Sequence, residues 1–277
     1  MSGARWVTWA ACIVWAVSAS MPDVATAHHV VSDSGIAWVE PLSVMDVELS
    51  AASFDLGEGR RGSWQTMAVT GQFTLGPRLS WNVRAPWAFV QFDDGRKVLG
   101  LGDMEFGAKG LLYATEHGAF ILSAGLGVEV PTGEARVELG SGHVEVSPYI
   151  AWAPQCAPRH LRFALVSGRR AITRAPAPAP QELGERIAHG SVLGPHGSAE
   201  IFGRLGVAFV EPERYYISTG VDAVGMAEGP SRGPLVWRGE VGWNVSDRVR
   251  IAAGVDRHLA GEARFGMKGR VNTAVFF

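Results

Sequence analysis

The amino-acid sequence predicts an all-β protein, a closed antiparallel up-and-down transmembrane β-barrel of about 12 strands. Three observations predict it: long segments in which apolar and polar residues alternate, connections that are short and long in turn, and tryptophans near the ends of the apolar faces. Successive side chains of a strand point to opposite faces, so each alternating segment has one apolar face and one polar face.

The C-terminal segment shows the alternation most clearly. One face would carry Phe265, Met267, Gly269, Val271, Thr273, Val275 and Phe277. The other face would carry Arg264, Lys268, Arg270 and Asn272. The pattern recurs upstream and predicts strands at roughly residues 43–54, 64–75, 79–91, 102–113, 119–130, 143–153, 160–168, 199–210, 214–225, 235–245, 249–257 and 264–277. Most of these segments have the length that a tilted strand needs to cross a bilayer.

The connections between these segments alternate in length. The short ones are residues 76–78, 114–118, 154–159, 211–213 and 246–248. The long ones are residues 55–63, 92–101, 131–142, 168–198, 226–234 and 258–263. Up-and-down membrane barrels have tight periplasmic turns at one end and extended outer loops at the other, and an even number of strands places both chain ends on the periplasmic side.

Tryptophans on the apolar faces form two groups that suggest membrane girdles. Trp81, Trp152 and Trp243 are near short connections, whereas Trp87 and Trp237 are near long ones. An indole has an apolar body and a polar N–H, which suits the two interfaces of a membrane. An open sheet would leave backbone groups unpaired in lipid, and ring closure removes its edges. The alternative is a soluble β-sandwich, which would have shorter strands and fewer tryptophans on its apolar faces.

The N-terminus has the layout of a cleavable export signal over residues 1–27, with a basic Arg5, an apolar run and the small residues Ala25 and Ala27. A lipoprotein signal would need Cys12 as the acylated residue, but few apolar residues precede it. We expect residues 28–42 to form a periplasmic tail or a plug within the barrel, and residues 43–277 to form the barrel itself.

Composition and motifs argue against several classes of function. The net charge is −2 and no basic stripe is present, which argues against nucleic acid as a partner. No Gly-x-Ser-x-Gly motif is present, so we expect neither an enzyme nor a cofactor, with a hydrolase at the barrel rim as a remote alternative. His28 and His29 would offer an α-amine and two imidazoles to copper or nickel after signal cleavage, or would simply be solvated.

The polar faces of the strands predict the residues that line the lumen. They are Arg84, Asp103, Glu105, Lys109, Glu129, Glu145, Arg162, Arg204, Asp222, Arg238, Glu240, Lys268 and Arg270. One interpretation is a polar pathway that selects solutes by charge and size. The other is a set of ion pairs that fills a barrel of intermediate width.

Two stretches resemble motifs of the outer-membrane transporter family named after the meta-pathway of phenol degradation. They are residues 100–109, with the sequence GLGDMEFGAK, and residues 130–134, with the sequence VPTGE, which the sequence LGSG follows at 139–142. The final Phe277 resembles the C-terminal signal that the bacterial barrel-assembly machinery reads. The resemblance rests on these short stretches and implies channels or transporters for small, often aromatic or hydrophobic, compounds.

These observations predict an outer-membrane channel or transporter for the passive, selective passage of small molecules in a Gram-negative bacterium. The expected partners are outer-membrane lipid and lipopolysaccharide, the barrel-assembly machinery and a small solute. The main alternative is a non-conducting barrel whose outer loops, chiefly residues 168–198, act in adhesion or assembly.

Overall fold

A computed structural model describes most of the predicted barrel. It covers residues 43–55, 61–115, 120–133, 139–140, 144–157, 160–173, 199–211, 214–226, 233–261 and 265–277. The predicted signal, the segment 28–42 with His28 and His29, and most of the longest connection lie outside the described residues.

The described chain forms one antiparallel sheet of 13 strands. They are β1 (Val44–Asp55), β2 (Arg61–Thr74), β3 (Leu79–Phe92), β4 (Lys97–Leu101), β5 (Met104–Ala114), β6 (Phe120–Val130), β7 (Glu145–Ala157), β8 (His160–Ala171), β9 (Ala199–Glu211), β10 (Tyr215–Met226), β11 (Leu235–Asn244), β12 (Val249–Ala260) and β13 (Met267–Phe276). Among the described residues, no helix is long and apolar enough to span a membrane.

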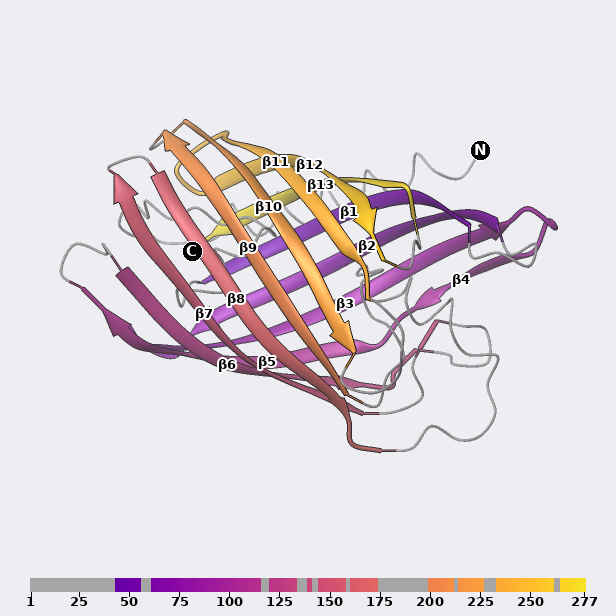
Figure 1. The fold of residues 1–277 in the computed structure, drawn as a ribbon, viewed down its shortest axis with the longest axis horizontal. Helices are drawn as coiled ribbons and strands as arrows, with labels where there is room; N and C mark the ends of the chain where they lie inside the picture. Colours follow the sequence, from indigo (N-terminus) through magenta and orange to yellow (C-terminus); the bar gives the residue numbers. More distant parts are fainter. Residues whose placement is uncertain are drawn as a thin grey trace.

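Twelve of these strands close into a ring, which confirms the predicted fold. Along the ring each strand pairs with the next one in sequence, except that β3 pairs with β5 because β4 lies in the connection between them. Strand β1 pairs with β2 and with β13, which completes the circle. In Figure 1, β8, β9 and β10 cross the view at a steep angle to β1, β2 and β3, as expected for the opposite walls of a tilted barrel. The C-terminus lies at the end where the short connections are, because Phe276 N donates to the carbonyl of Arg248 in the β11–β12 turn (2.8 Å).

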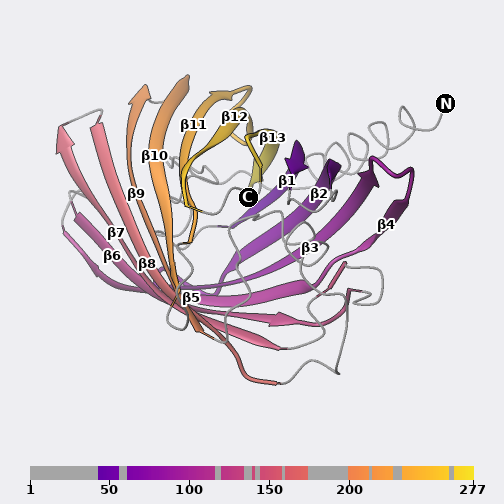
Figure 2. The ribbon, with the colours of Figure 1, turned by 45° about the vertical axis from the view of Figure 1, so that its right-hand side comes forward.

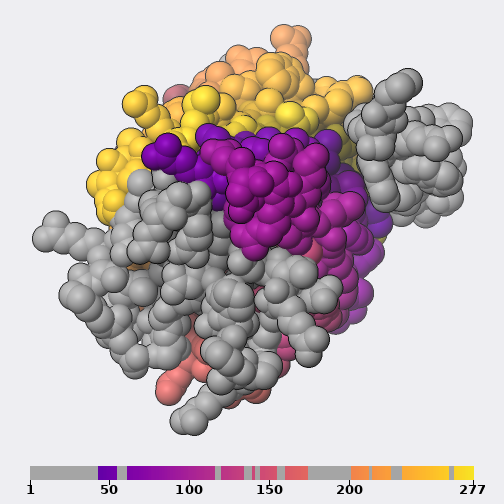
Figure 3. Space-filling model, turned by 90° about the vertical axis from the view of Figure 1, so that its right-hand side faces the viewer, coloured from indigo at the N-terminus to yellow at the C-terminus, as the bar shows by residue number. Residues whose placement is uncertain are grey.

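The thirteenth strand, β4, lies within residues 92–101, which the sequence predicts to be a long loop. Residues 93–96 turn the chain back on itself: the Asp94 side chain accepts a hydrogen bond from Arg96 N (2.8 Å), and Gly95 adopts a φ of 89°. Strand β4 then pairs with the end of β3, and β5 pairs with its beginning. The β3–β4 hairpin therefore projects from the long-connection end of the barrel (Figures 2 and 3).

The two faces of the ring differ as the alternation predicts. The outer face has exposed aliphatic side chains, such as Leu205 (65% exposed), Ile201 (58%) and Ile150 (50%). The inner face has buried polar and aromatic residues, including Arg204, which immediately precedes Leu205. A soluble β-sandwich would cover its apolar face with a second sheet, whereas the described strands form a single closed sheet with that face outward.

Candidate functional site: the lumen

The most prominent feature of the inner face is a chain of ion pairs across five consecutive strands, which we call the charged ladder. Its members are Arg204 on β9, Asp222 on β10, Arg238 and Glu240 on β11, Asp256 on β12, and Lys268 and Arg270 on β13. All seven side chains are buried, and the two signs alternate along the wall.

The contacts of the ladder are close at every step. Arg204 donates two hydrogen bonds to Asp222, from Nε to Oδ1 (2.7 Å) and from Nη2 to Oδ2 (2.8 Å). Arg238 bridges Asp222 (Nη1–Oδ2, 3.1 Å) and Asp256 (Nε–Oδ1, 3.2 Å). Such contacts hold the guanidinium groups against the wall, and those of Arg238 and Arg270 are each shared between two carboxylates.

Asp256 is the most connected carboxylate of the ladder. Besides Arg238, it contacts Arg270 (Nη1–Oδ1, 2.6 Å) and Lys268 (Nζ–Oδ2, 3.4 Å), and it is only 3% exposed. Arg270 also reaches Glu240 (Nη2–Oε2, 3.1 Å), and Glu240 accepts a hydrogen bond from the Tyr216 hydroxyl. Loss of the Asp256 carboxylate would therefore remove the shared partner of three cations.

The opposite wall has shorter networks of the same kind. Arg84 on β3 pairs with Glu105 on β5 (Nη1–Oε1, 2.8 Å). Arg169 on β8 pairs with Glu129 on β6 (Nη2–Oε2, 2.9 Å) and also contacts Glu145 on β7 through Nε. Polar and charged groups thus surround the lumen.

Residues 102–103 separate β4 from β5, and the next connection attaches to the wall at this point. The Asp103 side chain is fully buried and accepts a hydrogen bond from Gly133 N (2.7 Å). The Thr132 hydroxyl donates to the carbonyl of Gly102 (3.1 Å) and accepts from Met104 N (2.9 Å). The stretches 100–109 and 130–134, which resemble motifs of one transporter family, are therefore in direct contact.

An aromatic cluster lies inside the barrel at its long-connection end. This outer aromatic cluster consists of Phe54, Trp64, Ala88, Val90, Phe92, Leu139, Val236 and Phe265. The Trp64 ring is edge-on to that of Phe265 (centroids 5.9 Å apart) and 6.2 Å from that of Phe54. Leu139, which is 1% exposed, joins the cluster from the connection that docks on Asp103. The cluster lies beside the charged ladder, because Ala52 of β1 pairs with Trp64 on one side and with Lys268 on the other.

A second apolar cluster fills part of the short-turn half of the lumen. Its larger members are Ile121, Tyr149, Phe163, Leu165 and Tyr216. Apolar clusters therefore occupy parts of both halves of the lumen, beside ion pairs such as Arg169 with Glu129, which lie near the long-connection ends of β8 and β6.

The structure places most of the predicted lumen residues on the inner face. The residues at the alternate positions whose side chains point inward are Arg84, Asp103, Glu105, Lys109, Glu129, Glu145, Arg204, Asp222, Arg238, Glu240, Lys268 and Arg270. Arg162 is the exception, and its predicted position was wrong. It pairs directly with the exposed Val207, and the inner face of β8 is instead occupied by Phe163 and Leu165. Because both faces of β8 are largely apolar, a charged residue on one of them does not identify that face as the inner one.

Several inner-face residues are absent from the predicted set. They are Glu48, Arg169, Arg250 and Asp256. Arg169 lies beyond the predicted end of its strand, because β8 continues to Ala171. Arg250 and Asp256 are at the alternate positions of β12 whose side chains point inward, and the alternation of that segment predicts this. The Arg250 guanidinium carbon also lies over the Tyr216 ring, 5.2 Å from its centroid.

The remaining predicted site residues lie elsewhere. Those predicted to form membrane girdles have outward parity, and they are Trp81, Trp87, Trp152, Trp237 and Trp243. Phe277 N donates to the carbonyl of Ser43 (3.2 Å), and the Phe277 ring lies 5.6 Å from that of Phe73, at the seam where the ring closes. Within the described part of the chain, no group of three or more His, Cys, Asp or Glu residues is placed to hold a metal ion.

The comparisons with known proteins concern the fold. No protein-family model matches the sequence, and no curated protein does. An outer membrane channel from Pseudomonas putida F1 has a similar structure, with a TM-score of 0.68 at 12% identity over 92% of this chain and 100% of that chain. The KdgM porin has a TM-score of 0.52 at 9% identity over 84% and 99% of the two chains. The monoaromatic hydrocarbon channel CymD has a TM-score of 0.50 at 8% identity over 94% and 97%.

Proposed function

We propose that this protein is an outer-membrane channel for the passive, selective passage of small molecules. The observation that carries the proposal is the charged ladder on the inner face of a closed ring whose outer face is aliphatic. Cations on the inner face escape the penalty of about 2–4 kcal/mol that Arg or Lys incurs against lipid at mid-depth. The fold shared with the Pseudomonas putida F1 channel supports a location in the outer membrane.

We also propose that the solutes are small and have an aromatic or hydrophobic part. The outer aromatic cluster would contact the apolar part of such a solute, and the charged ladder, whose side chains are buried in the inner wall beside it, would discriminate between solutes by their charge. The two stretches that resemble motifs of a family of small-molecule transporters meet at Asp103, beside the outer aromatic cluster that Leu139 joins. The similar fold of CymD, a monoaromatic hydrocarbon channel, is compatible with this solute class.

The proposal assigns a side of the membrane to each end of the barrel. The short turns and both chain ends would face the periplasm, after export by a cleaved signal at residues 1–27. Phe277, at the closing seam, would be read by the barrel-assembly machinery. Outer-membrane phospholipid and lipopolysaccharide would surround the outward tryptophans. A passive channel of this kind requires neither a cofactor nor a catalytic residue.

Planar-bilayer recording of the purified full-length protein tests the proposal. We expect discrete current steps in KCl, and a reduction of the current by a small aromatic solute added to the side of the long connections. A barrel that acts only through its outer loops would insert without producing current steps, and that result would overturn the channel function.

The Leu139→Ala variant tests whether the outer aromatic cluster limits the current. Leu139 is buried among aromatic side chains at one end of the lumen, so its truncation should widen and wet a hydrophobic constriction. We expect a severalfold larger single-channel conductance. The matched control is Leu259→Ala, because Leu259 is exposed on the outer face of β12 at the same end. Equal conductance of the two variants would mean that the cluster does not restrict the pathway.

A further inference from the structure

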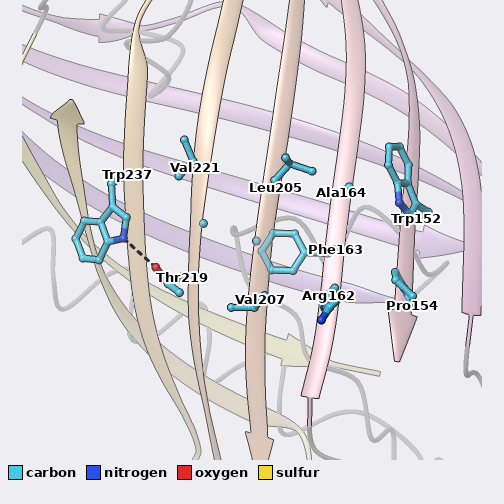
Figure 4. Close-up of a pocket in the computed structure, with 12 residues that line it drawn as sticks. Trp152, Pro154, Arg162, Phe163, Ala164, Leu205, Val207, Thr219, Val221 and Trp237 are labelled. Atoms are coloured by element: carbon cyan, nitrogen blue, oxygen red, sulfur yellow. Dashed lines mark hydrogen bonds between the residues drawn. The ribbon is translucent and has the colours of Figure 1, made fainter. Parts of the chain in front are cut away.

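We propose that a groove on the outer face of β7–β11 binds an anionic phospholipid, with the phosphate at Arg162 and one acyl chain between Trp152 and Trp237 (Figure 4). The inference rests on the proposed function, because it requires the outer face of the barrel to lie in a membrane. We call this feature the outer-face groove.

Backbone pairing places the walls of the groove. Trp152, Ala164, Leu205, Val221 and Trp237 are directly opposite one another on five successive strands, so they form one row across the sheet. The two indoles are the ends of this row, and the side chains between them are smaller. Ala164 is only 5% exposed and lies at the bottom of the groove. The volume of about 470 Å³ falls within the range of small-molecule pockets.

One wall is fixed by a hydrogen bond. Trp237 Nε1 donates to the Thr219 hydroxyl on the adjacent strand (2.9 Å), which holds the indole in place (Figure 4). The indole N–H is thereby satisfied within the protein, and its ring is left as an apolar wall. A hydrocarbon chain could lie against this wall without leaving a polar group unpaired in lipid.

Arg162 provides the polar end of the groove. It is exposed and lies two residues after the first residue of β8, near the short-turn end. Beside it, His160 is edge-on to Phe209 (5.4 Å between centroids), and Phe209 lies 6.3 Å from Tyr215. Aromatic residues of this kind mark the depth of the lipid headgroups, and a guanidinium binds phosphate through paired hydrogen bonds.

The position of Arg162 selects the lipid. In the proposed orientation the short-turn end faces the periplasm, and phospholipids form that leaflet of the outer membrane. A phosphate at Arg162 would extend its acyl chains toward Leu205, which is at the centre of β9. Arg162, which the alternation predicted to face the lumen, can therefore lie on the outer face, because it is at the depth of the lipid headgroups and not at mid-membrane.

Native mass spectrometry of the full-length protein, released from detergent micelles that contain one added lipid, tests the proposal. We expect the wild type to retain one molecule of phosphatidylglycerol, and Arg162→Gln to retain it about fivefold less, the effect of one cation near a lipid surface. The matched control is Arg170→Gln, an exposed residue of the same parity at the opposite end of β8. Ala164→Phe, which fills the bottom of the groove, should also reduce retention.

Two results would contradict the proposed binding of an anionic phospholipid in the outer-face groove. One is equal phosphatidylglycerol retention by the Arg162→Gln and Arg170→Gln variants. The other is equal retention of diacylglycerol, which has the acyl chains without the phosphate. Conductance separates this inference from the proposed function: Arg162→Gln should conduct like the wild type, because Arg162 lies outside the lumen. A conducting protein without lipid retention would contradict the groove alone, and a lipid-retaining protein without current would contradict the channel alone.

Discussion

Leu205→Arg is expected to lower the free energy of unfolding of the barrel in phospholipid vesicles by about 2–4 kcal/mol, the penalty of a cation facing lipid at mid-depth. Leu205 is at the centre of β9 and is 65% exposed on the outer face. Its neighbour Arg204 is buried on the inner face, in contact with Asp222. The measurement is a urea titration of the folded protein in vesicles, followed by tryptophan fluorescence.

Depth within the membrane provides the control for this prediction. Ile201 is on the same strand and the same face, but it lies near the long-connection end of β9. Ile201→Arg should therefore reduce stability by only about 0–1 kcal/mol, as near an interface. If the two variants were equally stable, the outer face of β9 would not be spanning a bilayer, and both the channel and the outer-face groove would be contradicted.

Asp256→Ala is expected to destabilise the barrel by about 3–5 kcal/mol, the usual loss when one partner of a buried ion pair is removed. The substitution leaves Arg238, Lys268 and Arg270 without the carboxylate that they share. Urea titration in vesicles measures the loss. The control is Asp247→Ala, because Asp247 is exposed in the β11–β12 turn.

The same substitution should change ion selectivity. Removal of a negative charge makes the inner wall more positive, so anions should permeate more readily relative to cations. The reversal potential in a KCl gradient measures this, and Asp247→Ala should leave it near the wild-type value. A destabilised Asp256→Ala barrel with unchanged selectivity would mean that the ladder supports the wall without facing the ion pathway.

The sequence predicted the strands well because the physics of one strand is local. Alternation and length can be recognised from each segment alone, so all 12 strands of the ring were predicted. The β3–β4 hairpin was predicted to be a loop, although the sequence contains its turn residues Asp94 and Gly95. Arg162 was misplaced because the alternation indicates a face only where one face is polar. In β8 the inner face is filled by Phe163 and Leu165.

The partners within the lumen could not be predicted, because they depend on register. That Asp256 contacts Arg238 and Arg270 follows from the pairing of β11, β12 and β13, which a single strand does not encode. Contact between Asp103 and Gly133 likewise requires an irregular connection to fold back on the wall. Neither arrangement has a periodic signal in the sequence.

The order of strand pairing in the ring has a consequence for how the protein folds. Apart from the seam between β1 and β13, the ring is built from strands that are adjacent in sequence or separated only by β4. All seven ladder residues lie within residues 204–270. Local contacts of this kind favour fast formation, whereas bringing together chain ends more than two hundred residues apart is slow. We therefore expect the C-terminal hairpins to assemble early, with their charges already neutralised, and the first and last strands to pair late.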